Sequence, residues 1–329
     1  EWTHPIQFGQ ENHPVYSPWD SWSQGVNITT TESPALCAFL YKECQSLLQI
    51  GEQLGFNNRK QDLQTKANQL AEAVERAWDE NRHVYLDWDR DTHVSTNGEL
   101  IAQTNGNGLI LLQRSFRQPK RLIIQIFSSS PSISQVKIFI HGTNQAGRHR
   151  VEQISYNGFR VSPEKFTSTT DSVYSTIEQI EIHGLSGEDQ ISVYQVNLSH
   201  PDHSHFTPLW AGITSKERAS VLIEQTLLDP ERFWKPFGVP VCTDMIPNPE
   251  GRICQAGSLF WHQIIGESLL AYGYREEAMQ LVSRLLNAVG QTLRSGSNFR
   301  QYTDSNNGDS WGELNALNGL APVDRKSVV

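Results

Sequence analysis

The segment from Pro230 to Tyr274 combines ring side chains, acids and loop-forming residues in a pattern that suggests a binding surface. It begins as a loop rich in proline and glycine and ends as an apolar helix, and its candidate contact residues are Phe233, Trp234, Phe237, Asp244, Trp261 and His262. Rings spread over such a loop cannot lie on one regular element, so they are either buried by a neighbouring element or presented to a ligand. We favour presentation to a ligand and expect this segment to form one wall of a pocket.

A second chemical cluster lies in HPVYSPWDSW, residues 13–22. Its rings, which include those of Trp19 and Trp22, surround a single carboxylate, that of Asp20. Asp20 is either a turn or cap residue of a ring-packed loop, or the acid of a sugar subsite, where a carboxyl group can exchange protons or bind hydroxyls. From these residues alone, both interpretations stay open.

The charge of the chain narrows the class of partner. Its 329 residues include 27 basic and 36 acidic side chains, for a net charge of −9. This balance argues against binding to nucleic acid or to an anionic membrane. A neutral partner such as a saccharide is compatible with it. No run of about 20 apolar residues is present, so we expect no membrane span.

Cysteine and histidine spacing gives no sign of a metal or cofactor. Cys37 and Cys44 fall on one expected helix at a spacing too wide for a bridge along it, and the four cysteines show no disulfide framework and no C-x-x-C site. The H-x-x-H-x-H pattern of residues 200–205 is more typical of a solvated linker than of a zinc site. We therefore expect no cofactor. The chain starts at Glu1 rather than Met and shows no leader, so location and oligomeric state stay open.

Helical periodicity governs the sequence on both sides of a central region. Ser33 can cap a helix whose first residue is Pro34, and leucines at spacings of three and four continue it to about Gly55. A second helix is expected over residues 59–78, which makes an antiparallel αα-hairpin. Further helices are expected from Ser215, Ser258 and Arg275.

The central region has the pattern of short strands. From about residue 113 to 200, alternating runs rich in Ile, Val, Tyr and Thr are separated by turns at intervals of roughly ten residues, which predicts a small β-sandwich. Such an insertion either binds carbohydrate or packs beside the helices, and we favour packing. Before it, VYLDWDRDT carries Asp87, Asp89 and Asp91, which we interpret as solvated acids rather than as calcium ligands.

Taken in order, these pieces resemble the six-hairpin (α/α)6-barrel glycoside hydrolases, such as mannosylglycerate hydrolases, oligosaccharide-trimming α-glucosidases and trehalases. The resemblance is carried by SPWD, VYLDWDRDT, TPLWAGI, ERFWKPFGVPV, GSLFWHQIIGESLLAYGY and FRQYTDSNNGDSWGELNALNGLAP. These phrases match the C-terminal half of the barrel once the β insertion is excised. The resemblance implies a mainly α fold, a partial (α/α)6 toroid interrupted by a small β-sandwich, in a chain that is a fragment.

The expected domains follow from this resemblance. Residues 1–112 would form the first part of the barrel, 113–200 the inserted β-sandwich, and 201–324 the second part of the barrel. Residues 324–329 read DRKSVV, a polar tail without apolar periodicity that we expect to be non-native.

The resemblance also implies an inverting mechanism, in which a carboxylic acid protonates the leaving oxygen and a carboxylate activates water. It places the acid beside SPWD and the base within FRQY. The matching residues here are Val15 and Gln301, and neither can exchange a proton. We therefore assign the roles of acid and base to Asp20 and Glu313.

Sugar binding draws on more residues than catalysis does. The phrases resemble pocket-lining segments, and the residues that we expect to bind substrate are Trp19, Trp22, Trp210, Trp234, Asp244, Trp261, His262, Gln301 and Trp311. We expect a hydrolase of α-glucosyl or α-mannosyl saccharides. The alternative is a carbohydrate-binding protein on the same scaffold that has lost hydrolysis. A third interpretation makes the β insertion an adhesion or assembly module.

Overall fold

The computed structural model describes residues 13–17, 20–56, 58–129, 133–243, 253–296 and 299–314. Contacts divide the chain into two compact units. The sheet unit is Glu1–Glu32 with Asp87–Ser199, and the helical unit is Ser33–Leu86 with His200–Val329. Of the described residues, 35% lie in helices and 33% in strands. The expected mainly α composition is therefore not observed, because the strands of the sheet unit are long enough to balance the helices.

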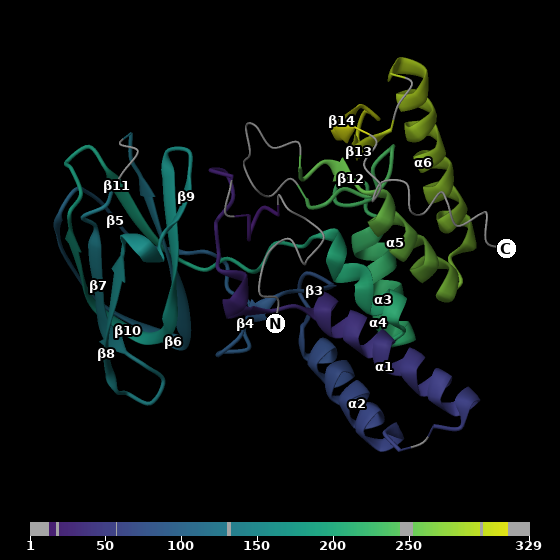
Figure 1. The fold of residues 1–329 in the computed structure, drawn as a ribbon, viewed down its shortest axis with the longest axis horizontal. Coiled ribbons are helices and arrows are strands. Elements are labelled where there is room, and N and C mark those ends of the chain that lie inside the picture. The colour runs from purple at the N-terminus through teal and green to yellow at the C-terminus, as the bar shows by residue number, and fades with distance from the viewer. Residues whose placement is uncertain are drawn as a thin grey trace. The chain divides into compact units, whose positions relative to one another are not determined.

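The helical unit is built from paired helices (Figure 1). Within the described residues these helices are α1 (Pro34–Leu54), α2 (Lys60–Arg76), α3 (Thr207–Ala211), α4 (Lys216–Leu222), α5 (Leu259–Ala271) and α6 (Arg275–Gly296). α1 packs against α2 and α3, α3 packs against α5, and α5 packs against α6. None of the described helices is both long enough and apolar enough to cross a membrane.

The ends of α1 follow directly from its sequence. The Ser33 side chain accepts a hydrogen bond from the Ala35 N–H at 3.2 Å, and Pro34 takes the first helical position, where a backbone N–H has no intrahelical partner. Gly55 ends the helix in the left-handed conformation, with φ of 74°, which a residue without Cβ adopts readily. The helix predicted from Ser33 to Gly55 is confirmed.

The later helices also begin where the sequence predicts. Ser215 caps α4 through its side chain, and Ser258 directly precedes α5. α6 starts at Arg275 and carries Glu276 and Glu277 in its first turn. Acidic side chains in the first turn interact favourably with the helix dipole.

Short strands and one disulfide complete the helical unit. The strands are β2 (Trp78–Asp79), β3 (Val84–Tyr85), β12 (Ala256–Gly257), β13 (Arg300–Asp304) and β14 (Ser310–Leu314). β2 pairs with β3, and β13 lies between β12 and β14 in a three-stranded sheet. A disulfide joins Cys242 to Cys254. The sequence analysis predicts no disulfide, because the four cysteines form no multi-cysteine framework and no C-x-x-C site.

The sheet unit contains one seven-stranded antiparallel sheet in the order β5-β11-β6-β10-β7-β8, with β9 paired to β10. β1 and β4 form a separate two-stranded pair. The strands of this unit are β1 (Thr31–Glu32), β4 (Trp88–Asp89), β5 (Leu100–Asn105), β6 (Gly108–Phe127), β7 (Lys137–Thr143), β8 (His149–Ser155), β9 (Arg160–Ser162), β10 (Lys165–His183) and β11 (Gln190–Gln195). The first strand of the large sheet, β5, therefore lies before residue 113, where the sequence analysis expects the β region to start.

Two strands, β6 with 20 residues and β10 with 19, run through most of the sheet. Their pairing shifts register at three places, and such bulges bend a strand and increase its twist. The first part of β6 pairs with the second part of β10, which also pairs with β7. The second part of β6 pairs instead with β11. One continuous sheet can therefore fold over on itself.

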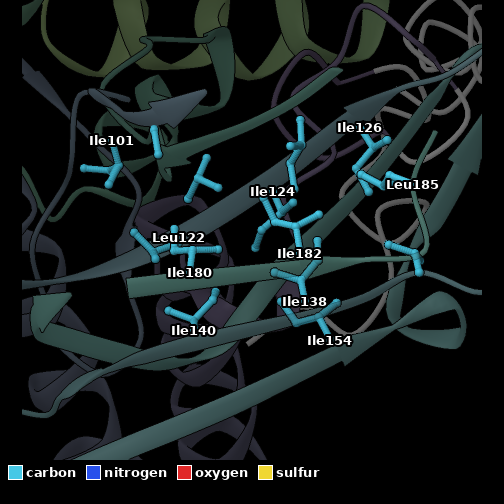
Figure 2. Close-up of a cluster of buried hydrophobic side chains, with 14 of the residues drawn as sticks. Ile101, Leu122, Ile124, Ile126, Ile138, Ile140, Ile154, Ile180, Ile182 and Leu185 are labelled. Carbon is cyan, nitrogen blue, oxygen red and sulfur yellow. The ribbon is translucent and has the colours of Figure 1, made fainter. Parts of the chain in front are cut away.

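Isoleucine dominates the core between the two ends of this sheet (Figure 2). The cluster draws residues from both ends, among them Ile101, Ile124, Ile138, Ile154, Ile180 and Ile191. Because β-branched side chains pack well on a pleated surface, such runs favour strands whose inner faces meet. The two ends of the sheet therefore pack against each other as the layers of a sandwich do.

The described part of residues 13–32 packs on the sheet. Val15, Tyr16, Val26 and Ile28 form an apolar cluster with sheet-unit residues that include Ile123. The segment that contains Asp20 is thus carried by the sheet unit, whereas the sequence assigned it to the first part of a helical barrel. Alternating strands predict a sheet, but they do not show which distant loop will cover one of its faces.

A buried arginine fixes the base of the sheet unit. Arg121, with 2% of its surface exposed, forms ion pairs with Asp89 and Asp91. It also donates hydrogen bonds to the carbonyl oxygens of Thr170 at 2.8 Å and Asp171 at 2.6 Å. The guanidinium group thereby links the β4 region to β6 and β10.

The three aspartates of VYLDWDRDT are therefore not simply solvated acids. Asp87 and Asp89 are buried, and Asp87 accepts a hydrogen bond from the Tyr16 hydroxyl. Partial burial alone would raise the pKa of Asp91, but hydrogen bonds and charges from two neighbouring arginines lower it. Among the described residues, no group of His, Cys, Asp or Glu is arranged to hold a metal ion.

Replacing the buried arginine is expected to destabilise the sheet unit strongly. Arg121→Met should lower the free energy of unfolding by about 3–5 kcal/mol, because it leaves the buried Asp89 carboxylate without its charge partner. Urea denaturation followed by circular dichroism measures the change.

Arg148 offers a matched control, since it is exposed. Arg148→Met should change the free energy of unfolding by no more than about 0.5 kcal/mol. The double variant Arg121→Met with Asp89→Asn should recover part of the loss, because the uncompensated charge is removed. A loss of the same size in Arg148→Met would contradict the assigned role of Arg121.

Candidate functional site

The residues predicted to bind or transform a substrate fall in both units. Asp20 and Trp22 belong to the sheet unit. Trp19 and Asp244 lie outside the described residues. The other predicted residues belong to the helical unit, namely Trp210, Trp234, Trp261, His262, Gln301, Trp311 and Glu313.

The loop before α5 is fastened to the β13–β14 hairpin of the helical unit. The Phe237 N–H donates to the carbonyl oxygen of Ser305 at 2.8 Å. The Phe237 ring lies so close to Gly308 that a Cβ there would be 2.7 Å from it. Gly308 also has a φ of 78°, so both space and backbone conformation favour glycine. The loop and the hairpin turn therefore hold each other in place.

The β13–β14 hairpin gathers an amide, two rings and a carboxylate. Tyr302 faces Trp311 across the strands, with ring centroids 4.8 Å apart. The Gln301 Nε2 donates to the Tyr302 hydroxyl at 3.1 Å, and the Gln301 Oε1 accepts the Glu313 N–H at 3.4 Å. Both ends of the Gln301 amide are thus used within the hairpin.

Two polar groups of the hairpin have no partner among the described residues. Glu313 is exposed, and its carboxylate makes no ion pair or hydrogen bond within the described part of the chain. Trp311 is half-buried, and its Nε1 is buried without a hydrogen-bond partner among the described residues.

His262 lies at the centre of the predicted pocket wall, but its ring is occupied by the main chain. Nε2 accepts the Val239 N–H at 2.7 Å, so Nδ1 carries the proton that is donated to the Ser258 carbonyl oxygen at 2.5 Å. A Cβ at Gly238 would lie 2.3 Å from Nε2. Burial lowers the pKa of His262 to about 4, although the Ser258 hydrogen bond opposes this. The geometry is that of a neutral clamp between the loop and α5.

The tryptophans differ in how far they are buried. Trp261 is 2% exposed and stacks on His203 with ring centroids 4.6 Å apart, so it belongs to the core. Trp210 is half-buried, and its Nε1–H donates to Glu267 Oε2 at 2.8 Å. Trp234 is half-buried beneath the Arg284 guanidinium group, at 4.4 Å.

Asp20 and Trp22 are both partly exposed in the sheet unit. The Ser17 hydroxyl donates to Asp20 Oδ2 at 2.7 Å. Oδ1 has no partner among the described residues. This arrangement suits a turn residue, and it also leaves one carboxyl oxygen open toward a ligand.

The disulfide is the clearest feature of this region that sequence reasoning missed. It brings the Cα atoms of Cys242 and Cys254 to 4.5 Å, and the Val241 N–H donates to the Ala256 carbonyl oxygen at 2.8 Å beside it. The available signal was a pair of cysteines flanking a segment rich in proline and glycine. Cys254 lies two residues before the start of β12.

Comparison with protein families gives one match. Residues 2–116 match the family described as the mannosylglycerate hydrolase MGH1-like glycoside hydrolase domain. The match includes the segment that carries Asp20 and the α1–α2 hairpin. No relative is found among curated proteins.

Solved structures add a fold-level likeness. The mannosylglycerate hydrolase of Thermus thermophilus, of family GH63 and in complex with glucose, is 14% identical over 89% of this chain and 47% of its own, with a TM-score of 0.48. The neutral trehalase of Saccharomyces cerevisiae is 12% identical over 97% of this chain and 41% of its own, with a TM-score of 0.51. The chain thus spans less than half the length of these proteins. It resembles the six-hairpin glycosidases, as its phrases indicate.

The buried clamp predicts a specific dependence of stability on pH. The pKa of His262 falls from 6.5 to about 4 on folding. Between these two pH values, His262 is protonated in the unfolded chain and neutral in the folded chain. The free energy of unfolding should therefore fall as the pH drops toward 4, by about 3 kcal/mol from this group. Urea midpoints of the helical circular dichroism signal across that range measure it.

Two variants isolate the contribution of His262. His262→Gln should be less stable at neutral pH, because one amide cannot reproduce both ring contacts, but its stability should depend less on acid. His149→Gln, at an exposed position, should keep the dependence of the original chain. Equal slopes for His262→Gln and the original chain would show that this ring is not a neutral clamp.

Proposed function

We propose that this chain is part of a glycoside hydrolase of the six-hairpin type that acts with inversion on an α-linked glucosyl or mannosyl saccharide. The observation that carries the proposal is the match of residues 2–116 to the mannosylglycerate hydrolase MGH1-like glycoside hydrolase domain. The fold likeness to the trehalase supports it. The chain covers less than half of those proteins, so the proposal concerns the activity of the whole protein.

In this proposal, Asp20 is the general acid and Glu313 is the general base. Asp20 would protonate the leaving oxygen through its open Oδ1, and the exposed carboxylate of Glu313 would take a proton from the attacking water. Inversion requires the two carboxyl groups to stand about 6.5–9.5 Å apart with the water between them.

The sugar contacts are assigned to the partly exposed rings. Trp311, whose indole N–H is unused, and Trp22 would lie against the C–H faces of the pyranose. Trp210 and Trp234 would contribute from their open edges. Trp261 and His262 are enclosed, so they support the site rather than touch the sugar.

A second candidate function is a carbohydrate-binding protein that has lost hydrolysis. It is favoured by the two positions where the resemblance expects the acid and the base. Val15 is 3% exposed within an apolar cluster, and Gln301 is an amide held at both ends in the hairpin. Neither side chain can exchange a proton.

The enzymatic proposal predicts that removing either carboxyl group stops turnover. In the complete protein, Asp20→Asn or Glu313→Gln should lower kcat by about 10²–10⁴-fold, because each removes a proton-transfer group, with little change in the affinity for substrate. Hydrolysis of a panel of α-glucosides and α-mannosides measures kcat and KM.

Matched controls come from exposed glutamates in the same units. Glu188→Gln in the sheet unit and Glu231→Gln in the helical unit should leave kcat unchanged. Activity that survives both Asp20→Asn and Glu313→Gln would reject the assigned pair. Two results together would establish the non-catalytic alternative instead. The original protein would bind a saccharide in calorimetry without releasing product, and the Gln301→Glu variant would gain hydrolysis.

A further inference from the structure

The sheet unit carries a hollow that no part of the proposed hydrolase uses. Its volume is about 460 Å³, which lies in the range of about 300–1,000 Å³ typical of small-molecule sites. The side chains around it include Glu99, Arg114, Phe116, Arg117, Lys120 and Gln195. All belong to the sheet unit.

A bulge in β6 creates one wall of this hollow. Ser115 pairs with Thr176 and Lys120 pairs with Tyr174, so residues 116–119 stand opposite a single residue of β10. Pro119 suits this place because it has no N–H to offer the ladder. A bulge turns side chains away from their regular alternation, and bulges are frequent beside binding sites. Here it directs consecutive polar and ring side chains to the rim of one hollow.

The only carboxylate among these side chains is already neutralised. Glu99 forms an ion pair with Arg114, and it accepts a hydrogen bond from the Gln195 Nε2 at 2.9 Å. The Arg114 guanidinium group also lies 5.6 Å from the centroid of the Phe116 ring. Arg114, Glu99 and Gln195 thus form a linked group in which the charges of Arg114 and Glu99 cancel.

Two cations remain without a partner. Within the described residues, neither Arg117 nor Lys120 makes an ion pair or a side-chain hydrogen bond. The hollow therefore carries two uncompensated positive charges on a chain whose net charge is −9. Partial burial lowers the pKa of Lys120, and Glu99 opposes this shift. An ammonium group that has lost part of its hydration gains more from an anionic partner than a fully solvated one does.

We propose that this hollow binds an anionic saccharide, one that carries a carboxylate or a sulfate group. Arg117 and Lys120 hold the anionic group by charge-assisted hydrogen bonds. The amides of Asn97, Gln118 and Gln195 border the same hollow and match the donor and acceptor pattern of sugar hydroxyls. A long polyanion such as a nucleic acid is disfavoured, because the acidic surface of the rest of the chain repels it.

This binding does not depend on hydrolysis by the proposed carboxyl pair. It gives the sheet unit a recognition role of its own, in place of mere packing beside the helices. A chain without glycosidase activity would still bind the acidic sugar, so the two proposals can fail separately.

Calorimetric titration of the complete chain tests the proposal. The probes are digalacturonic acid, a sulfated disaccharide, neutral maltose, inorganic sulfate and a short single-stranded DNA. One or both acidic saccharides should bind, and their affinity should fall as salt is raised. The carboxylate and sulfate probes distinguish the two sources of the anionic group. Stronger binding of sulfate alone or of DNA than of either acidic saccharide would overturn the proposal, as would no binding of either acidic saccharide.

A charge-matched pair of variants ties the affinity to the hollow. Arg117→Gln with Lys120→Gln should weaken binding by about tenfold or more, since charge-assisted hydrogen bonds are lost. Lys137→Gln with Arg148→Gln removes the same charge at exposed positions of the same unit and should leave the affinity within about twofold at moderate salt. Unchanged circular dichroism confirms folding, and Arg117→Lys with Lys120→Arg should retain most of the binding. Equal losses in the two neutralised pairs would refute the site.

Discussion

The loops of the helical unit depend on one buried imidazole. His262 accepts the Val239 N–H and donates to the Ser258 carbonyl oxygen, so a single ring satisfies a loop donor and a helix-end acceptor. An unpaired buried polar group costs about 1–3 kcal/mol. Because the neutral ring alone offers one donor and one acceptor, the site excludes the protonated form. The loop it fixes is the one that carries Phe237 to the hairpin, so the position of the hairpin follows from this clamp.

Local signals explain what the sequence predicts well. Ser33, Pro34 and Gly55 act on the backbone within a few residues, and so the ends of α1 can be read directly from the sequence. His262 shows the limit of this approach. Its loop partner lies 23 residues away, and a histidine on an apolar helix has the same sequence pattern whether it binds a sugar or the main chain. The sequence alone could not distinguish a histidine that contacts a ligand from one that binds the main chain.

Packing between segments that are distant in the sequence decides most of the features that local signals do not predict. The Asn27 N–H donates to the Thr169 hydroxyl across 142 residues, and this pairing places the segment with Asp20 in the sheet unit. The bulge in β6 arises in the same way, because only the register against β10 shows that residues 116–119 leave the ladder. In the sequence, Arg117 and Lys120 look like the polar positions of an ordinary strand. Their convergence on one hollow is a property of the fold.

The two positions that depart from the glycosidase pattern depart in physically different ways. Val15 is enclosed by apolar side chains, so a carboxyl group there would be buried away from solvent, whereas Asp20 in the same unit is partly exposed. Gln301 instead occupies a place that would accept a carboxylate without rearrangement, because the Glu313 N–H and the Tyr302 hydroxyl can both donate to an oxygen at that position. A glutamate in place of Gln301 would therefore add a carboxylate to the hairpin without a change of scaffold.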